Sequence, residues 1–270
     1  MPDVEVPRDR WGRPLILQPD GSLEPYARAS KIGEILDDQY NLAQWQQRQV
    51  AWGVWQNPAL LHALAEAGAA ELDDRQRKQK LGAVVEQAHE AAGSHLKAER
   101  GTLLHSFTEE YDRGVIGLDD EWTHTDYDDV AARDLRAYAA ATESLKILHI
   151  ERFVANHDAK AAGTYDRLVE VDGRKYIADI KTGSIYGSSK IAMQLAVYAF
   201  GHHYDPDTGL SEPHFADRER GIVIHLPQGE ARCDLYWIDI EAGGDALNIA
   251  SDVKAWRGRR TKLLTPFKIN

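Results

Sequence analysis

The spacing of apolar residues divides the chain into a helical part and a part that mixes strands with helices. From Ser30 to about Arg113, apolar residues recur at helical spacing, with glycine or proline near the breaks. The segment DYDDVAARDLRAYAAATESLKIL has the same spacing and predicts one further helix. After it, short apolar runs predict strands in the segments HIERFVA, GTYDRLVEV, RKYIADIKT, GIVIHLP and CDLYWIDI.

Two more helices complete the predicted order of elements. The segment SSKIAMQLAVYAFGHHY follows the third strand, and a last helix begins near Gly244. This order predicts an α/β fold in which a small mixed sheet is flanked by helices. We predict a helical N-terminal part over residues 1–93, packed on a core that comprises residues 94–270.

The dipeptide Asp172-Gly173 predicts how two of the strands pair. Asp-Gly between two apolar runs is typical of a two-residue hairpin turn, and such a turn sets the register of its strands. In the resulting register Asp166 lies directly opposite Asp179. Lys181 lies two residues beyond Asp179 and therefore on the same face. The hairpin should gather two carboxylates and one ammonium at the end of an apolar strand.

Two carboxylates that face each other across a strand pair repel, so the sequence predicts a cation between them. Oxygen ligands suit Mg²⁺ or Mn²⁺ better than zinc. A lysine beside such a site can help to deprotonate water or stabilise negative charge on a phosphate. The alternative is a solvated hairpin end with an ordinary Asp–Lys ion pair.

Composition and charge narrow the class of protein. The 270 residues are 43% hydrophobic and 28% charged, which is typical of a soluble globular protein, and we expect the cytoplasm as its location and no membrane contact. A single cysteine, Cys233, is too few for an internal disulfide or a four-cysteine metal centre. The net charge of −11 argues against a protein that coats nucleic acid by bulk electrostatics, but it leaves room for a local basic groove.

Four short motifs together resemble those of one enzyme family. GTLLH lies on a predicted helix, GTYD and DIKTG lie on the paired strands, and QLAVY lies on the helix that follows. In this order and spacing they resemble the RecB-like branch of the PD-(D/E)XK nucleases, over residues 101–198. The resemblance implies a restriction-endonuclease-like core. Some members hold an iron–sulfur cluster with four cysteines; the single cysteine here points to the cluster-free branch, which includes many phage exonucleases.

The resemblance also implies roles for individual residues. The implied metal ligands are His105, Asp166, Asp179 and the backbone carbonyl of Ile180. Lys181 matches the catalytic lysine, and Glu151 matches an acidic position often seen in this branch. Gln194 and Tyr198 match a Q-x-x-x-Y motif that helps to position DNA. Without the family, His105 would be read as an ordinary polar residue of a helix.

Three further residues are candidates for contact with DNA. Lys190 forms a polar stripe with Gln194 and Tyr198 at steps of four residues, for which the alternative is a solvent-exposed helix face. Thr182 directly follows Lys181, the residue that matches the catalytic lysine. Arg28 is close to a predicted helix start, where backbone N–H groups favour a phosphate.

The expected function is that of a metal-dependent DNA exonuclease of phage recombination, repair or DNA processing. It would hydrolyse phosphodiester bonds from free ends of linear or single-stranded DNA and leave a 5′-phosphate, with Mg²⁺ or Mn²⁺ and no iron–sulfur cluster. Two alternatives stay open: a structure-specific endonuclease or resolvase on the same fold, and a DNA-end-binding module with a vestigial site. A recombination partner protein and a homo-oligomer with a basic bore are compatible with this function.

Overall fold

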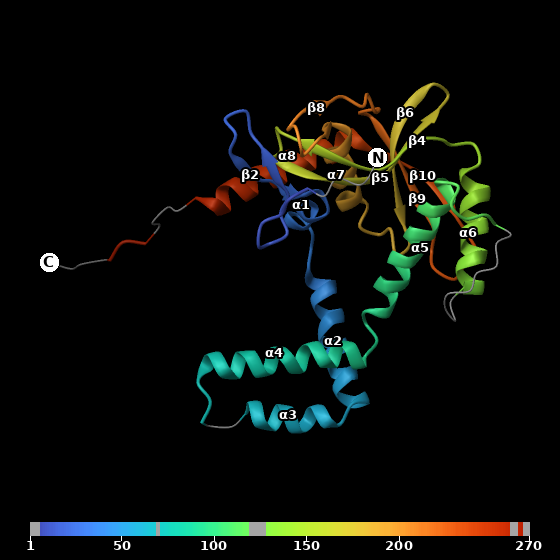
Figure 1. Cartoon of the computed structure of the whole chain (residues 1–270). Helices are drawn as coiled ribbons and strands as arrows, with labels where there is room; N and C mark the ends of the chain where they lie inside the picture. Colours follow the sequence, from blue (N-terminus) through green and yellow to red (C-terminus); the bar gives the residue numbers. More distant parts are fainter. Residues whose placement is uncertain (1–5, 69–70, 119–127, 260–263, 267–270) are drawn as a thin grey trace. The chain divides into compact units, whose positions relative to one another are not determined.

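The computed structural model describes residues 6–68, 71–118, 128–259 and 264–266, and the chain divides into two units (Figure 1). The first, which we call the sheet unit, consists of Met1–Asp37 and Tyr111–Asn270. The second, the helical unit, is Asp38–Glu110. The predicted boundary after residue 93 therefore falls inside the helical unit.

A mixed β-sheet is the framework of the sheet unit. Among the described residues it has eight strands, in the order β10-β9-β6-β5-β4-β7-β8, with β3 paired to one end of β5. The pairs β6/β9 and β3/β5 are parallel and the others are antiparallel. The strands of this sheet are β3 (Ala27–Arg28), β4 (Lys146–Asn156), β5 (Ala161–Val171), β6 (Arg174–Lys181), β7 (His202–Tyr204), β8 (Ser211–Glu212), β9 (Arg220–His225) and β10 (Asp234–Asp239). A separate hairpin joins β1 (Leu15–Leu17) to β2 (Leu23–Pro25). The coarse prediction of an α/β fold with a mixed sheet flanked by helices is confirmed.

The register predicted from Asp172-Gly173 is confirmed over the paired part of β5 and β6. The pairs run from Val171↔Arg174 to Arg167↔Ala178. Asp172 and Gly173 both have positive φ, 51° and 76°, as this type of hairpin turn requires.

The pairing on this edge of β5 stops before Asp166. Farther along the same edge, β5 pairs with β3 at Ala161 and Ala162. On this edge of β5, residues 163–166 lie between these two partners and pair with no described strand, whereas β4 pairs along the opposite edge. We call this gap, on the edge of β5 between β3 and β6, the notch.

Helices α7 (Ser188–Ala199) and α8 (Ile240–Gly258) pack against each other and, with α1 (Ala29–Ile32) and the 3₁₀ helix η1 (Gly33–Ile35), bury the main apolar core. The packing of α7 on α8 is close: a Cβ on Gly243 would lie 2.3 Å from the carbonyl oxygen of Ala192. Leu195 and Val197 of α7 are fully buried in the core with Leu168 and Ile177 of the sheet. The core therefore forms where α7 covers β5 and β6.

Three predicted helix boundaries were wrong. Helix α8 begins at Ile240 rather than near Gly244, because the Asp239 side chain accepts a hydrogen bond from the Ala242 amide (2.8 Å) and caps the helix. Helix α7 ends at Ala199, and the following segment His202–Tyr204 is strand β7. Helix α6 (Asp128–Thr142) ends before Lys146, where β4 begins. In the last two cases strand pairing overrides helical spacing.

The helical unit contains α2 (Tyr40–Gln56), α3 (Ala59–Ala67), α4 (Asp74–Ala91) and most of α5 (Leu96–Asp112). Its buried apolar cluster is small and centres on Leu60, Val84 and Ala88. Helices α2 and α4 cross so closely that a Cβ on Gly53 would lie 1.8 Å from the Ala88 carbonyl oxygen. Only glycine allows this approach.

None of the described helices combines the length and the apolar character needed to cross a membrane.

Candidate active site

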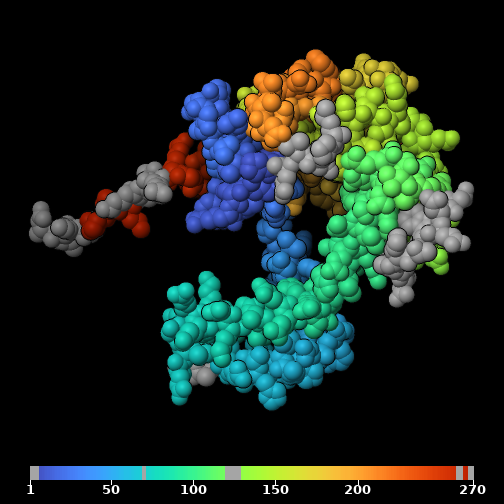
Figure 2. All heavy atoms as spheres, viewed as in Figure 1, coloured from blue at the N-terminus to red at the C-terminus, as the bar shows by residue number. Residues whose placement is uncertain are grey.

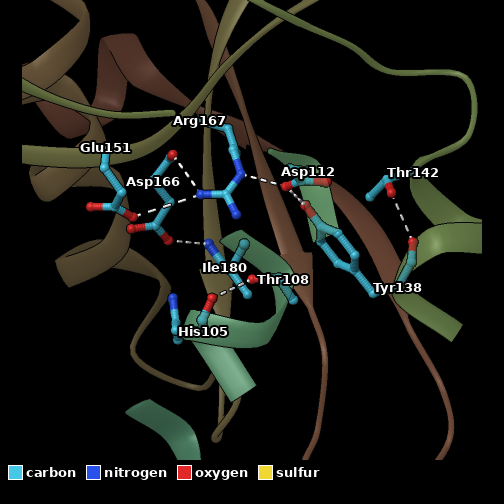
Figure 3. A network of polar contacts seen from close by, with 9 residues as sticks. All are labelled: His105, Thr108, Asp112, Tyr138, Thr142, Glu151, Asp166, Arg167 and Ile180. Carbon is cyan, nitrogen blue, oxygen red and sulfur yellow. Dashed lines mark hydrogen bonds and ion pairs between the residues drawn. The ribbon is translucent and has the colours of Figure 1, made fainter. Parts of the chain in front are cut away.

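Asp166 lies on β5 at the edge of the notch, and its side chain bonds to the opposite strand. Its Oδ2 accepts a hydrogen bond of 2.6 Å from the backbone amide of Ile180 on β6 (Figure 3). The strand pairs end one step earlier, at Arg167↔Ala178. The carboxylate therefore replaces a backbone carbonyl as the acceptor for β6 at this point.

Asp179 is the most buried acidic group of the site. Its Oδ1 accepts a hydrogen bond from Gln194 Nε2 at 3.3 Å. Its Oδ2 is buried and has one charged partner, Lys181 Nζ, at 2.6 Å, and it accepts no hydrogen bond from any other described residue. One carboxylate oxygen is thus directed into the site with an incomplete set of partners.

Burial and neighbouring charge perturb both members of this ion pair. Burial, and then the charge of Asp166, raise the pKa of Asp179 to about 7, although Lys181 acts in the opposite direction. Burial acts to lower the pKa of Lys181, but the charges of Asp179 and Asp166 outweigh it and raise that pKa. The lysine is therefore an ammonium at neutral pH, while the buried carboxyl is poised between its two protonation states.

Helix α7 contributes a glutamine and a tyrosine to the site. Gln194 Nε2 donates to Asp179 Oδ1 and also lies 3.3 Å from Tyr198 Oη, and Gln194 Oε1 accepts from Lys181 Nζ at 3.5 Å. Tyr198 is buried, and burial raises the pKa of its hydroxyl, so the phenol stays protonated. The stripe alternative of a solvent-exposed helix face does not hold for these two residues.

A buried polar network lies beside Asp166 (Figure 3). The side chain of Arg167 is 1% exposed, and its Nε donates to Oδ2 of Asp112, which is 3% exposed (2.6 Å). Tyr138 of α6 donates its hydroxyl hydrogen to the same oxygen at 2.6 Å. Arg167 Nη1 donates to the backbone carbonyl of Asp166 at 2.8 Å. The network therefore fixes the backbone that carries the first carboxylate.

The position of Arg167 in the sequence is a signal for this network. Arg167 lies on a predicted strand, directly before the apolar residues Leu168 and Val169. An arginine that is buried needs an acidic partner, because an unpaired buried charge is strongly unfavourable. The identity of that partner, Asp112, lies 55 residues away in the sequence and could not be inferred from the strand.

Glu151 lies on β4 and contacts the same arginine. Its Oε1 is 3.7 Å from Arg167 Nη1 (Figure 3). Its φ is +48°, in the left-handed region, between the paired residues Ile150 and Arg152. A residue other than glycine in this region costs on the order of 1–3 kcal/mol, and such strain is concentrated at functional sites. Glu151 is thus close to the site through Arg167.

Two predicted DNA contacts are engaged elsewhere in the sheet unit. Lys190 Nζ lies 3.2 Å from Glu34 Oε1 of η1. The carbonyl oxygen of Thr182 accepts from the amide of Gln228 (3.3 Å), and its hydroxyl accepts from the side chain of Gln228 (3.4 Å). Thr182 is thus braced by the loop between β9 and β10.

The other predicted site residues lie on different elements. Arg28 ends β3, beside Ala162, and directly precedes α1, a helix of only four residues. His105 belongs to the helical unit, where its carbonyl oxygen accepts a hydrogen bond from the Thr108 hydroxyl. Their roles in DNA or metal binding stay predictions.

The donor set of the notch fits a hard divalent cation. It offers the carboxylates of Asp166 and Asp179, and Oδ2 of Asp179 is buried with the Lys181 ammonium as its one partner among the described residues. Within the described ranges, no group of three or more His, Cys, Asp or Glu side chains is arranged to hold a metal ion. Mg²⁺ commonly uses one or two carboxylates together with several waters and substrate oxygens, so a pair is a sufficient protein contribution.

No protein-family model matches the chain, and no curated protein matches it.

Proposed function

We propose that this protein is a divalent-metal-dependent deoxyribonuclease that degrades DNA from free ends. The observation that carries the proposal is the carboxylate of Asp179, which is buried close to a second carboxylate, that of Asp166, and has the Lys181 ammonium 2.6 Å from its Oδ2. Two carboxylates that share a buried site repel each other, and this repulsion is costly because one ammonium balances only one of the two charges. A cation shared with Asp166 would remove that cost.

The resemblance to RecB-like PD-(D/E)XK nucleases supports the same conclusion from the motifs. In that interpretation Asp166 and Asp179 hold Mg²⁺ or Mn²⁺, and His105 and the Ile180 carbonyl complete the ligand set. When bound, the cation supplies positive charge at the phosphate and makes water there more acidic.

Three residues of the chain have further roles in the proposed reaction. Because the pKa of Lys181 is raised, its ammonium keeps its proton and serves as a fixed positive charge for the pentavalent phosphate, not as a base. Gln194 orients the carboxylate of Asp179 through its amide. Arg167 holds the backbone of Asp166 and so keeps the two acidic groups in register.

The test compares two aspartates of the same hairpin. The full-length protein, Asp179→Asn and Asp172→Asn are incubated with linear and covalently closed circular DNA in Mg²⁺, Mn²⁺ or EDTA. We expect wild type to degrade linear DNA only with metal, and Asp179→Asn to be inactive. Asp172→Asn, an exposed turn carboxylate that asparagine replaces without backbone strain, should keep wild-type activity.

Each alternative function gives a different result in this experiment. Rapid nicking or linearisation of closed circles would indicate the endonuclease. Binding to DNA ends without cleavage under all metal conditions would indicate a vestigial site. Equal activity of Asp179→Asn and wild type would refute the assignment of the site itself.

A further inference from the structure

Helix α2 of the helical unit has an unusual composition for an exposed helix. Its sequence, YNLAQWQQRQVAWGVWQ, is rich in glutamine, contains no acidic residue, and carries Arg48 as its only charge. The whole chain, in contrast, has a net charge of −11. Helix α2, drawn in blue in Figures 1 and 2, is therefore a locally cationic element of an acidic protein.

One face of α2 carries three exposed tryptophans. Trp45, Trp52 and Trp55 are 40%, 49% and 69% exposed. At 3.6 residues per turn, Trp45 and Trp52 are about 20° apart around the helix axis, and Arg48 and Trp55 lie within about 80° of Trp45. We call these four residues the tryptophan face.

The tryptophan face is not the side that holds the helical unit together. Gly53 meets Ala88 of α4 at the close crossing, and Val50 and Val54 pack on the small apolar cluster. These residues lie on the opposite side of α2. An exposed aromatic surface that contributes nothing to the core marks a binding surface.

Two of the indole rings are already arranged as a stacking platform. The rings of Trp52 and Trp55 are stacked, with centroids 4.6 Å apart and planes 26° from parallel. In the amide orientation that satisfies both neighbours, the Gln56 side-chain oxygen accepts from Trp52 Nε1 at 2.8 Å. The polar edge of Trp52 is thus satisfied inside the unit, and its outer ring surface is left for an aromatic ligand.

We propose that the tryptophan face binds single-stranded DNA by stacking on unpaired bases. Flat aromatic surfaces stack on any base, whereas the bases of a duplex present no free ring faces. Arg48 makes no ion pair among the described residues, so it is available to a phosphate, and α2 has no carboxylate to repel one. The proposal rests on the proposed nuclease function for its purpose and names single-stranded DNA as the substrate class.

The test measures binding without cleavage. The full chain in EDTA is titrated into a labelled oligothymidylate of about 20 nucleotides, a blunt duplex of the same length, and an oligomer of abasic sites, with fluorescence anisotropy as the readout. We expect the single strand to bind more tightly than the duplex or the abasic oligomer. Trp52→Ala and Trp55→Ala should each weaken binding to the single strand by about 5-fold to 150-fold, the loss expected for one base stack.

The controls separate stacking from charge and from folding. Arg48→Gln should weaken single-strand and abasic binding by the same factor and reduce the salt dependence. Trp256→Ala removes an equally exposed tryptophan of α8 in the sheet unit and should leave binding unchanged. Trp52→Phe keeps an aromatic ring, so it should retain much of the affinity and guards against loss of fold in the alanine variant.

The outcomes distinguish this proposal from the proposed nuclease function. Unchanged single-strand affinity in both alanine variants would overturn the tryptophan face. A second result would also overturn it: light scattering shows a dimer, and Trp52→Ala converts the dimer to a monomer without changing the DNA affinity. The tryptophan face would then bind a second copy of the chain. A protein that binds through α2 but never cleaves DNA would refute the nuclease function and leave the tryptophan face standing.

Discussion

Replacing Arg167 with methionine should be among the most damaging single substitutions in the sheet unit. Methionine fills a similar volume but removes the guanidinium, which is 1% exposed. The Asp112 carboxylate, 3% exposed, would then stay buried with the Tyr138 hydroxyl as its remaining partner in the network. The carbonyl of Asp166 would lose a donor at 2.8 Å.

The expected magnitude follows from these contacts. Removing one partner of a buried ion pair costs about 3–5 kcal/mol, because the other charge stays desolvated. Tyr138→Phe removes one hydrogen bond to a charged acceptor and should cost about 1.5–3 kcal/mol. The double substitution Arg167→Met with Asp112→Leu removes both charges and should cost at least about 2 kcal/mol less than the sum of the two single substitutions.

Urea unfolding followed by circular dichroism measures these differences in the free energy of unfolding. Arg174→Met is the matched control, since its side chain is 70% exposed and lies 3.8 Å from Asp217, a pair that should contribute less than about 1 kcal/mol. An Arg167→Met variant no less stable than this control would refute the reasoning. Strict additivity in the double variant would refute it as well.

Three further outcomes are expected. Because the native pKa of Asp179 is about 7 rather than 3.8, the folded metal-free protein binds the extra proton, so its stability should fall by about 4 kcal/mol as the pH rises from about 4 to about 7. Asp179→Asn should abolish that fall when the free energy of unfolding is measured in urea with EDTA at each pH. The same pH dependence of stability in the variant and in wild type would contradict this expectation. Lys181→Met should lower the cleavage rate by about 10²–10³-fold while calorimetry still detects Mn²⁺ binding, and a near-normal rate would return the lysine to a structural role. Gly53→Ala should destabilise the helical unit by about 1–3 kcal/mol, because its Cβ would lie 1.8 Å from the Ala88 carbonyl oxygen. Gly82→Ala on α4 is the control: a Cβ there has nothing within 4 Å, so this substitution should stabilise the unit. Equal melting temperatures of the two variants would show that the helix crossing can relax.

Local chemistry was sufficient to predict the hairpin at the centre of the site. The Asp172-Gly173 turn sets the register of β5 and β6, because its positive φ angles fit only one short turn geometry. The two-residue period of a strand then puts Asp179 and Lys181 on one face. Both steps depend on residues close in sequence, which is why the pattern alone was reliable here.

Helix and strand boundaries were less predictable, because partners distant in sequence decide them. The segment His202–Tyr204 continues a helical pattern, but β4 pairs with it at Val154 and Ala155 and makes it a strand. Neither the pattern nor the composition of the segment contains those partners.

The features that shape the candidate site beyond the hairpin depend on the tertiary structure. The notch is bounded on one side by the last pair of β5 with β6 and on the other by β3, a strand that comes from residues 27–28. Arg167 is stable inside the sheet because Asp112 of α5 pairs with it, and Tyr138 of α6 donates to the same oxygen of Asp112. The sequence by itself determined which charged groups share a strand end; only long-range packing decided which of them are buried, because burial and desolvation depend on every element that covers the site.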